Sequence, residues 1–96
     1  MNIVPPETND PQQVELPQVT FNTFIMSLAS STMVHLGEVP NPETGKTSVN
    51  LQLAQHTIDI LTMLQEKTKA CLEPDEAKLL GGLLYELRMK YVLHKG

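Results

Sequence analysis

The chain lacks tryptophan, has only two phenylalanines and two tyrosines, and contains one cysteine, Cys71. A single cysteine rules out an intramolecular disulfide and a zinc site built from several cysteines. A lone thiol is typical of a reducing compartment. The N-terminal residues also lack the basic region and the apolar run of a secretory signal. These absences predict a cytoplasmic protein.

Lysine and arginine are absent from residues 1–45, which hold five acidic residues and therefore a charge of −5. Residues 46–96 hold all seven basic residues and six acidic ones, a charge of +1, so that the net charge of the chain is −4. A protein that binds nucleic acid needs a clustered basic face. The charge distribution therefore argues against nucleic acid as a partner.

Long apolar runs are absent too, and none approaches the roughly 20 residues that a membrane-spanning helix needs. No alternating β pattern and no internal repeat is visible. The 96 residues suffice for one small domain, and a domain of that size buries only about 60–65% of the surface of its unfolded chain. We therefore expect self-association or a protein partner to bury more apolar surface.

Four of the seven prolines lie within residues 1–19, among acidic residues and glutamines and without an apolar period. This composition predicts a disordered or extended N-terminal tail. The tail is interpreted as a spacer or as a short recognition segment that uses Val14, Leu16 and Val19. We divide the chain into this tail, residues 1–19, and a single helical domain, residues 20–96.

The first predicted helix, at about residues 20–36, begins with Thr20 as an N-cap and ends before Gly37. Its apolar residues recur with a helical period, and no charged residue lies between Thr20 and Gly37. A helix with so little charge is usually buried on more than one side. We therefore predict an interaction surface on this helix, made of Phe21, Phe24, Ile25, Met26, Met33 and Leu36.

Two further helices are predicted, at about residues 51–68 and 74–93. Asn50 is the predicted cap of the helix at 51–68. Pro74 suits the first position of the helix at 74–93, whereas Glu73 is a weak cap for it. The four-residue link Lys69–Leu72, which precedes the cap residue Glu73, favours an antiparallel hairpin. The predicted fold class is therefore all-α, with three helices. Gly81-Gly82 indicates a close helix crossing, a kink or a tolerated weakness, because each mid-helix glycine costs about 1 kcal/mol relative to alanine.

The segment Gly45-Lys46-Thr47 matches the end of a phosphate-binding loop, G-x-x-x-x-G-K-[ST]. Such a loop binds phosphate with backbone N–H groups, but Pro40 occupies the first glycine position and has no N–H to donate. Pro42 removes a second donor, and Glu43 would repel phosphate. We interpret residues 38–49 as a rigid turn between two helices.

Three residues suggest an alternative function as a small metal-binding or enzymatic protein. His56 and Asp59 are three positions apart on a predicted helix, a spacing that can place two ligands on one face, and His35 could join them. Lysines lie near Cys71 in the sequence, but no base that could activate its thiol is evident beside it. No catalytic constellation emerges, so we predict neither an enzyme nor a cofactor.

Four blocks of the sequence resemble a family of small bacterial proteins known only as a domain of unknown function. The blocks are F-N-T-F-I-M-S-L-A-S-S, H-L-G-E-V-P-N-P-E-T-G, N-L-Q-L-A-Q-H-T-I-D-I-L-T-M-L-Q-E-K-T and L-L-Y-E-L-R-M-K-Y-V. The resemblance covers about residues 20–93 and implies a bacterial, cytoplasmic, helical protein without an assigned activity. The chain departs from the family at Glu73, where threonine is common, and at Gly81-Gly82, where polar residues are common.

The leading functional prediction is a non-enzymatic helical module that forms homo-oligomers or binds another protein. Its basis is the uncharged stretch of residues 20–37 in a domain too small to bury all of it.

Overall fold

The computed structural model describes residue 16 and residues 18–96. Within these residues the chain forms three helices and no strand: α1 (Phe21–His35), α2 (Leu51–Thr68) and α3 (Pro74–Lys95). The predicted all-α fold with three helices is confirmed. The disordered tail predicted for residues 1–19 lies, except for residues 16, 18 and 19, outside the described part of the chain, and Leu16 and Val19 are exposed.

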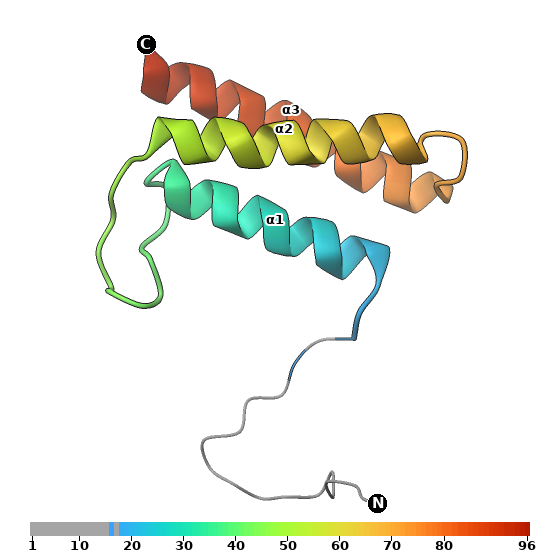
Figure 1. Ribbon diagram of the computed structural model, residues 1–96, viewed down its shortest axis with the longest axis horizontal. Coiled ribbons are helices and arrows are strands. Elements are labelled where there is room, and N and C mark those ends of the chain that lie inside the picture. The colour runs from blue at the N-terminus through green and yellow to red at the C-terminus, as the bar shows by residue number, and fades with distance from the viewer. Residues whose placement is uncertain (1–15, 17) are drawn as a thin grey trace, which may run out of the picture.

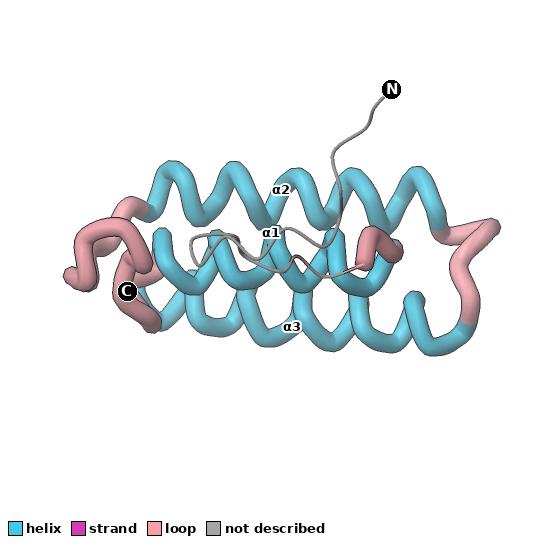
Figure 2. Tube along the Cα trace, turned by 90° about the horizontal axis from the view of Figure 1, so that it is seen from below, coloured by secondary structure: helices cyan, strands magenta, loops and turns pink. Residues whose placement is uncertain are grey.

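The three helices form one bundle in which each contacts the other two. Figure 1 shows α2 and α3 side by side and running in opposite directions, joined by a short turn. From below, α1 lies over the line between α2 and α3, as Figure 2 shows. The loop between α1 and α2 and the end of α3 therefore lie at the same end of the bundle.

Local hydrogen bonds define the helix starts. The Thr20 hydroxyl accepts a bond from the Thr23 N–H at 3.0 Å, and the Thr20 N–H donates to the Thr23 hydroxyl at 2.9 Å. Asn50 Oδ1 accepts from the Leu53 N–H at 3.1 Å. Both predicted caps are confirmed. Each satisfies an N–H group that has no partner within its own helix.

The core lies between the three helices and consists mostly of aliphatic side chains. The buried residues are Ile25, Ala29 and Leu36 from α1 and its end, Ala54, Ile58 and Leu61 from α2, and Leu80, Leu84 and Leu87 from α3. Thr32 and Thr57 are also buried, and their hydroxyl oxygens lie 2.7 Å apart. Because both hydroxyls also reach carbonyl oxygens of their own helices, this buried polar pair is satisfied.

The loop between α1 and α2 bonds to itself. The Asn41 N–H donates to the Lys46 carbonyl at 2.9 Å, and the Gly45 N–H donates to the Asn41 carbonyl at 2.7 Å. Gly45 adopts a φ of +72°, which glycine allows at no steric cost. The N–H groups that a phosphate loop would direct at a ligand are thus used within the turn. This geometry supports the interpretation as a rigid turn.

The third helix extends two residues beyond its predicted end at residue 93, to Lys95. Glu38, in the loop after α1, lies 2.7 Å from His94 Nε2 and 3.6 Å from Lys90 Nζ. These contacts tie the last turn of α3 to the loop, which local sequence signals could not reveal.

Candidate interaction surface on α3

α3 carries apolar side chains on two opposite faces. Leu80, Leu84 and Leu87 form the inner face, which is buried against α1 and α2. On the other side Tyr85, Met89, Val92 and Leu93 are 67%, 47%, 63% and 75% exposed. We call this set, together with Gly81 and Gly82, the α3 outer face. A helix normally buries its apolar stripe, yet the described residues cover only one of the two apolar faces of α3.

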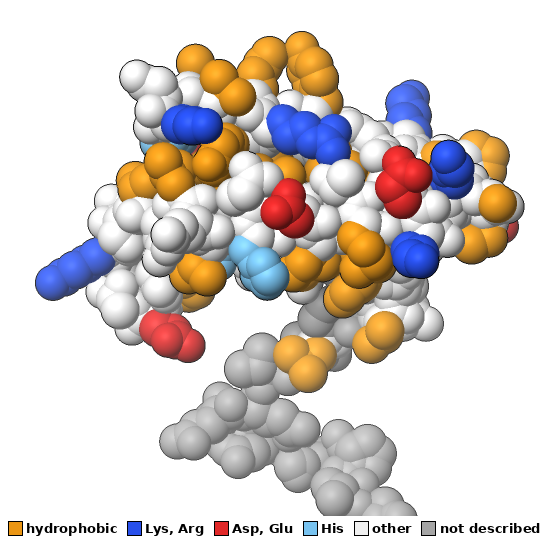
Figure 3. All heavy atoms as spheres, turned by 45° about the horizontal axis from the view of Figure 1, so that its top comes forward, with side chains coloured by type: hydrophobic (Ala, Val, Ile, Leu, Met, Phe, Trp, Pro, Cys, Tyr) orange, Lys and Arg blue, Asp and Glu red, His pale blue; other side chains and the backbone are white. Residues whose placement is uncertain are grey.

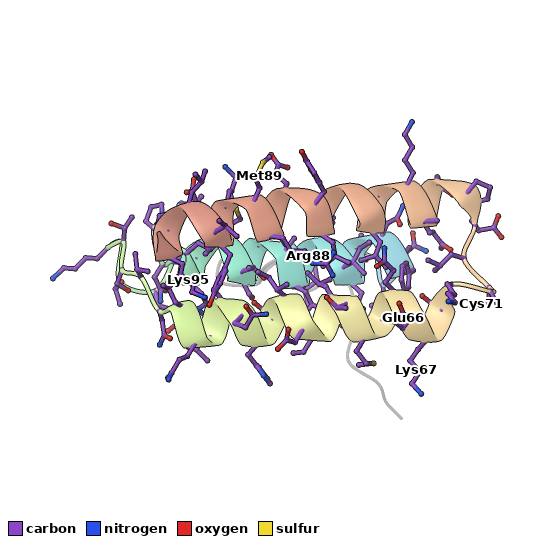
Figure 4. All side chains as sticks on the ribbon, turned by 90° about the horizontal axis from the view of Figure 1, so that it is seen from above. Glu66, Lys67, Cys71, Arg88, Met89 and Lys95 are labelled. Atoms are coloured by element: carbon purple, nitrogen blue, oxygen red, sulfur yellow. The ribbon has the colours of Figure 1, made fainter. Side chains whose placement is uncertain are left out.

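Two views show how the α3 outer face lies in the bundle. Hydrophobic side chains stand out along the upper edge of the molecule, where α3 lies (Figure 3). Met89 points away from the other two helices, whereas Arg88 points toward α2 (Figure 4). The Arg88 Nη2 donates a hydrogen bond to the Thr62 hydroxyl at 2.8 Å. This bond draws the guanidinium toward α2.

A shallow groove of about 410 Å³ runs between the α3 outer face and α2. Gln65 lines it from α2, and Arg88 lines it from α3 together with Gly81, Tyr85 and Leu93. A groove with apolar walls and a few polar groups is suited to bind an apolar segment of another chain. The groove also enlarges the apolar surface that is available to a partner beside α3.

Gly81 and Gly82 lie at the start of the α3 outer face. A Cβ built on Gly82 would meet no described atom within 4 Å, and one on Gly81 would meet only Gln65 Nε2, at 4.0 Å. Of the three interpretations of this pair, the close helix crossing within the chain is therefore wrong. α3 is assigned as one continuous helix through both positions. The packing of the described residues does not require either glycine.

The surface predicted on α1 requires a correction. Ile25 and Leu36 are fully buried in the core of the chain and are not part of an exposed surface. Phe21 and Met33 are half-buried against the same core. Only Phe24 and Met26, at 48% and 45%, are substantially exposed.

α1 has no charged residue even on the side that is exposed to solvent. Its solvent-facing side is formed largely by neutral polar residues, which include Ser27, Ser30 and Ser31. Hydroxyl groups hydrate that side without charge. By contrast, sequence reasoning missed Tyr85, Met89 and Leu93. Their spacing of four residues was a visible signal, because it places the three side chains on one helix face.

The three residues of the metal-site alternative do not form a site. Among the described residues, no three His, Cys, Asp or Glu side chains gather closely enough to hold a metal ion. His35 lies at the end of α1, and His56 is exposed on α2. Asp59 accepts a hydrogen bond from Gln55 Nε2 at 2.7 Å. Cys71 is exposed in the turn between α2 and α3.

Glu38, Lys90 and His94 form a polar cluster that joins the loop after α1 to the end of α3. The hydrogen bond from His94 and the positive charge of Lys90 lower the pKa of the Glu38 carboxyl below its ordinary value of 4.5, although desolvation opposes this shift. These contacts hold the end of α3 against the loop after α1. We assign this cluster a structural role.

Comparison with known proteins identifies a family but no activity. A family model described as a domain of unknown function, DUF1844, matches residues 18–93, and the chain belongs to that family. Neither a curated protein nor a solved structure matches the chain. None of the helices in the described part of the chain combines the length and the apolar content that a membrane span requires.

Proposed function

We propose that this member of the DUF1844 family is a non-enzymatic helical interaction module, which binds a second copy of itself or another protein through the α3 outer face. The observation that carries the proposal is that α3 is apolar on two opposite faces, of which the described residues cover one. Covering the other face in a complex would remove its apolar surface from water, which is the main favourable term in association.

The composition of the α3 outer face supports this role. Tyrosine and methionine are enriched at protein interfaces, and charged residues are depleted at their centres. Tyr85 and Met89 lie in the middle of the face, whereas Arg88 is folded toward α2. A face with two glycines at one end also lets another chain approach the α3 backbone closely.

The exposed part of α1 is a second candidate contact. Phe24 and Met26 remain available there after Ile25 and Leu36 are assigned to the core. This surface holds fewer exposed apolar side chains than the α3 outer face. We propose it as an additional contact of the same module.

The proposed setting is the cytoplasm of a bacterium. Cys71 is exposed, and an exposed thiol persists in a reducing compartment.

Each helix carries one methionine of nearly equal exposure, and these three residues provide a matched test. Met26 on α1 is 45% exposed, Met63 on α2 is 47% exposed and Met89 on α3 is 47% exposed. Each is replaced by glutamate in the full chain. The mass is measured by light scattering over a hundredfold dilution, and proteins that co-purify from the native cell extract are compared.

We expect Met89→Glu to lose the association that the wild type shows, because a carboxylate at the centre of an interface must be desolvated. Met63→Glu is expected to keep it, which controls for the chemistry of the substitution. A loss in Met26→Glu would add α1 to the contact surface. The proposed function is wrong if Met89→Glu retains the wild-type mass and every associated protein.

A further inference from the structure

We infer that the α3 outer face binds the α3 outer face of a second copy of this chain, with the two helices antiparallel. This inference rests on the proposed function and specifies its partner. It draws on three observations: the spacing of the exposed residues, the unused glycines and the distribution of charge along α3.

The exposed residues follow the spacing of a helix–helix seam. Gly82, Tyr85, Met89 and Val92 are separated by three, four and three positions. Alternation of three and four is the heptad pattern by which one helix keeps a continuous stripe against another. The buried residues Leu80, Leu84 and Leu87 belong to the opposite side of the same helix. The seam is thus a second packing stripe, separate from the one that the bundle uses.

The seam is self-complementary when two copies run antiparallel. The twofold axis crosses the outer side of α3 at the level of Leu87. It places Gly82 opposite Val92 of the second copy, and Tyr85 opposite Met89. Each contact then occurs twice, as an isologous interface requires. The missing side chain at Gly82 makes room for the branched Val92, and a thioether against an aromatic ring is a favourable contact.

The glycine pair gives this pairing a physical reason. Each mid-helix glycine costs about 1 kcal/mol relative to alanine, and an added Cβ would be accommodated at both positions among the described residues. Within one copy the cost therefore has no packing benefit. Close approach of a second helix at Gly82 would supply that benefit.

Charge along α3 selects the antiparallel direction. The start of the helix is acidic, with three acidic residues and one basic one: Glu73, Asp75, Glu76 and Lys78. The last two turns hold three basic residues and no acidic one: Arg88, Lys90 and Lys95. An antiparallel pair keeps the two acidic starts apart, because each lies beyond residue 96 of the other copy in this register, and it also opposes the two helix dipoles. A parallel pair would place like charges together.

The size of the contact indicates how stable the dimer is. A 22-residue helix is about 33 Å long and about 10 Å across, so one face of α3 offers less than the roughly 800 Å² per partner of a standard interface. The dimer is therefore expected to dissociate within a hundredfold dilution. Such a dimer exchanges its subunits, which allows variants to be mixed.

Disulfide cross-linking of mixed variants tests the pairing. In full chains that carry Cys71→Ser, Gly82→Cys and Val92→Cys are prepared separately, mixed and oxidised mildly. Both variants should fold, because a Cβ at Gly82 meets no described atom within 4 Å and Val92 is exposed; circular dichroism checks this. A mixture of Leu53→Cys with Val92→Cys, in which Leu53 is exposed on α2, measures random collision.

We expect the Gly82→Cys and Val92→Cys mixture to form disulfide dimers at least tenfold faster than the Leu53→Cys control and than either variant alone. Rapid cross-linking of Gly82→Cys with itself would show a parallel pair and overturn the inference. Equal rates in all samples would overturn it as well. In both cases the proposed function still stands if Met89→Glu, but not Met63→Glu, loses binding. If the wild type stays monomeric but has a Met89-dependent partner, that partner is another protein.

Discussion

α1 and α3 differ in a way that reverses the expectation drawn from their charges. α1 has no charged residue, yet three of its five exposed residues are serines, and the side chains at Ile25 and Ala29 are buried. α3 has seven charged residues, yet it exposes Tyr85, Met89 and Leu93. Lack of charge is therefore a poor measure of exposed apolar surface. A better measure is whether a helix has more apolar faces than its neighbours cover.

The largest predicted effect is the difference in unfolding free energy between substitutions on the two faces of α3. Leu84→Ala removes a side chain that is 1% exposed, and we expect it to lower the free energy of unfolding by about 2–5 kcal/mol, because a cavity remains. Leu93→Ala removes an exposed side chain and should change it by no more than about 0.5 kcal/mol. Chemical denaturation of dilute protein measures both. Similar losses would mean that both faces of α3 are buried in one copy.

The next prediction compares the glycine that ends α1 with one inside α3. Gly37 has a φ of +76°, and an added Cβ would lie 2.8 Å from Val49 Cγ2, so Gly37→Ala should cost about 1–2 kcal/mol of stability. Gly82→Ala should instead stabilise the dilute monomer by about 1 kcal/mol, since helix propensity improves without a clash. Thermal or chemical unfolding of both variants checks the opposite signs. Destabilisation by Gly82→Ala in dilute protein would reveal a packing role within one copy.

The smallest effect concerns the contacts that Glu38, in the loop after α1, makes with Lys90 and His94 at the end of α3. The pKa of Glu38 is lowered in the folded state, so this carboxylate contributes stability above its ordinary pKa of 4.5, and the contribution is lost as the pH falls through the folded value. Glu38→Gln should therefore be less stable than the wild type at neutral pH. The difference should shrink below pH 4.5 in acid titrations of unfolding. A constant difference across that range would contradict the assignment.

Much of the fold could be predicted because its signals are local. Thr20 and Asn50 each supply a cap oxygen within three residues of the N–H that it satisfies, and Pro74 marks a helix start. The end of α3 was missed because Glu38 holds it from a distant loop.

The interaction surface was less predictable, because it depends on which stripe packs inward. α3 has two apolar stripes, and only its pairing with α1 and α2 decides that Leu84 is buried and Met89 exposed. The same pairing buries Ile25 and Leu36, which the pattern alone had placed on a surface.

The central claim is that a second copy covers the α3 outer face, and the oxidation rates of two methionines in the wild-type chain test it most directly. Met63 and Met89 are equally exposed in one copy, at 47% each, so hydrogen peroxide should oxidise both at the same rate in very dilute protein. In concentrated protein we predict that the oxidation of Met89, but not that of Met63, becomes several-fold slower, as measured by mass spectrometry of peptides. Equal rates at every concentration would contradict the claim.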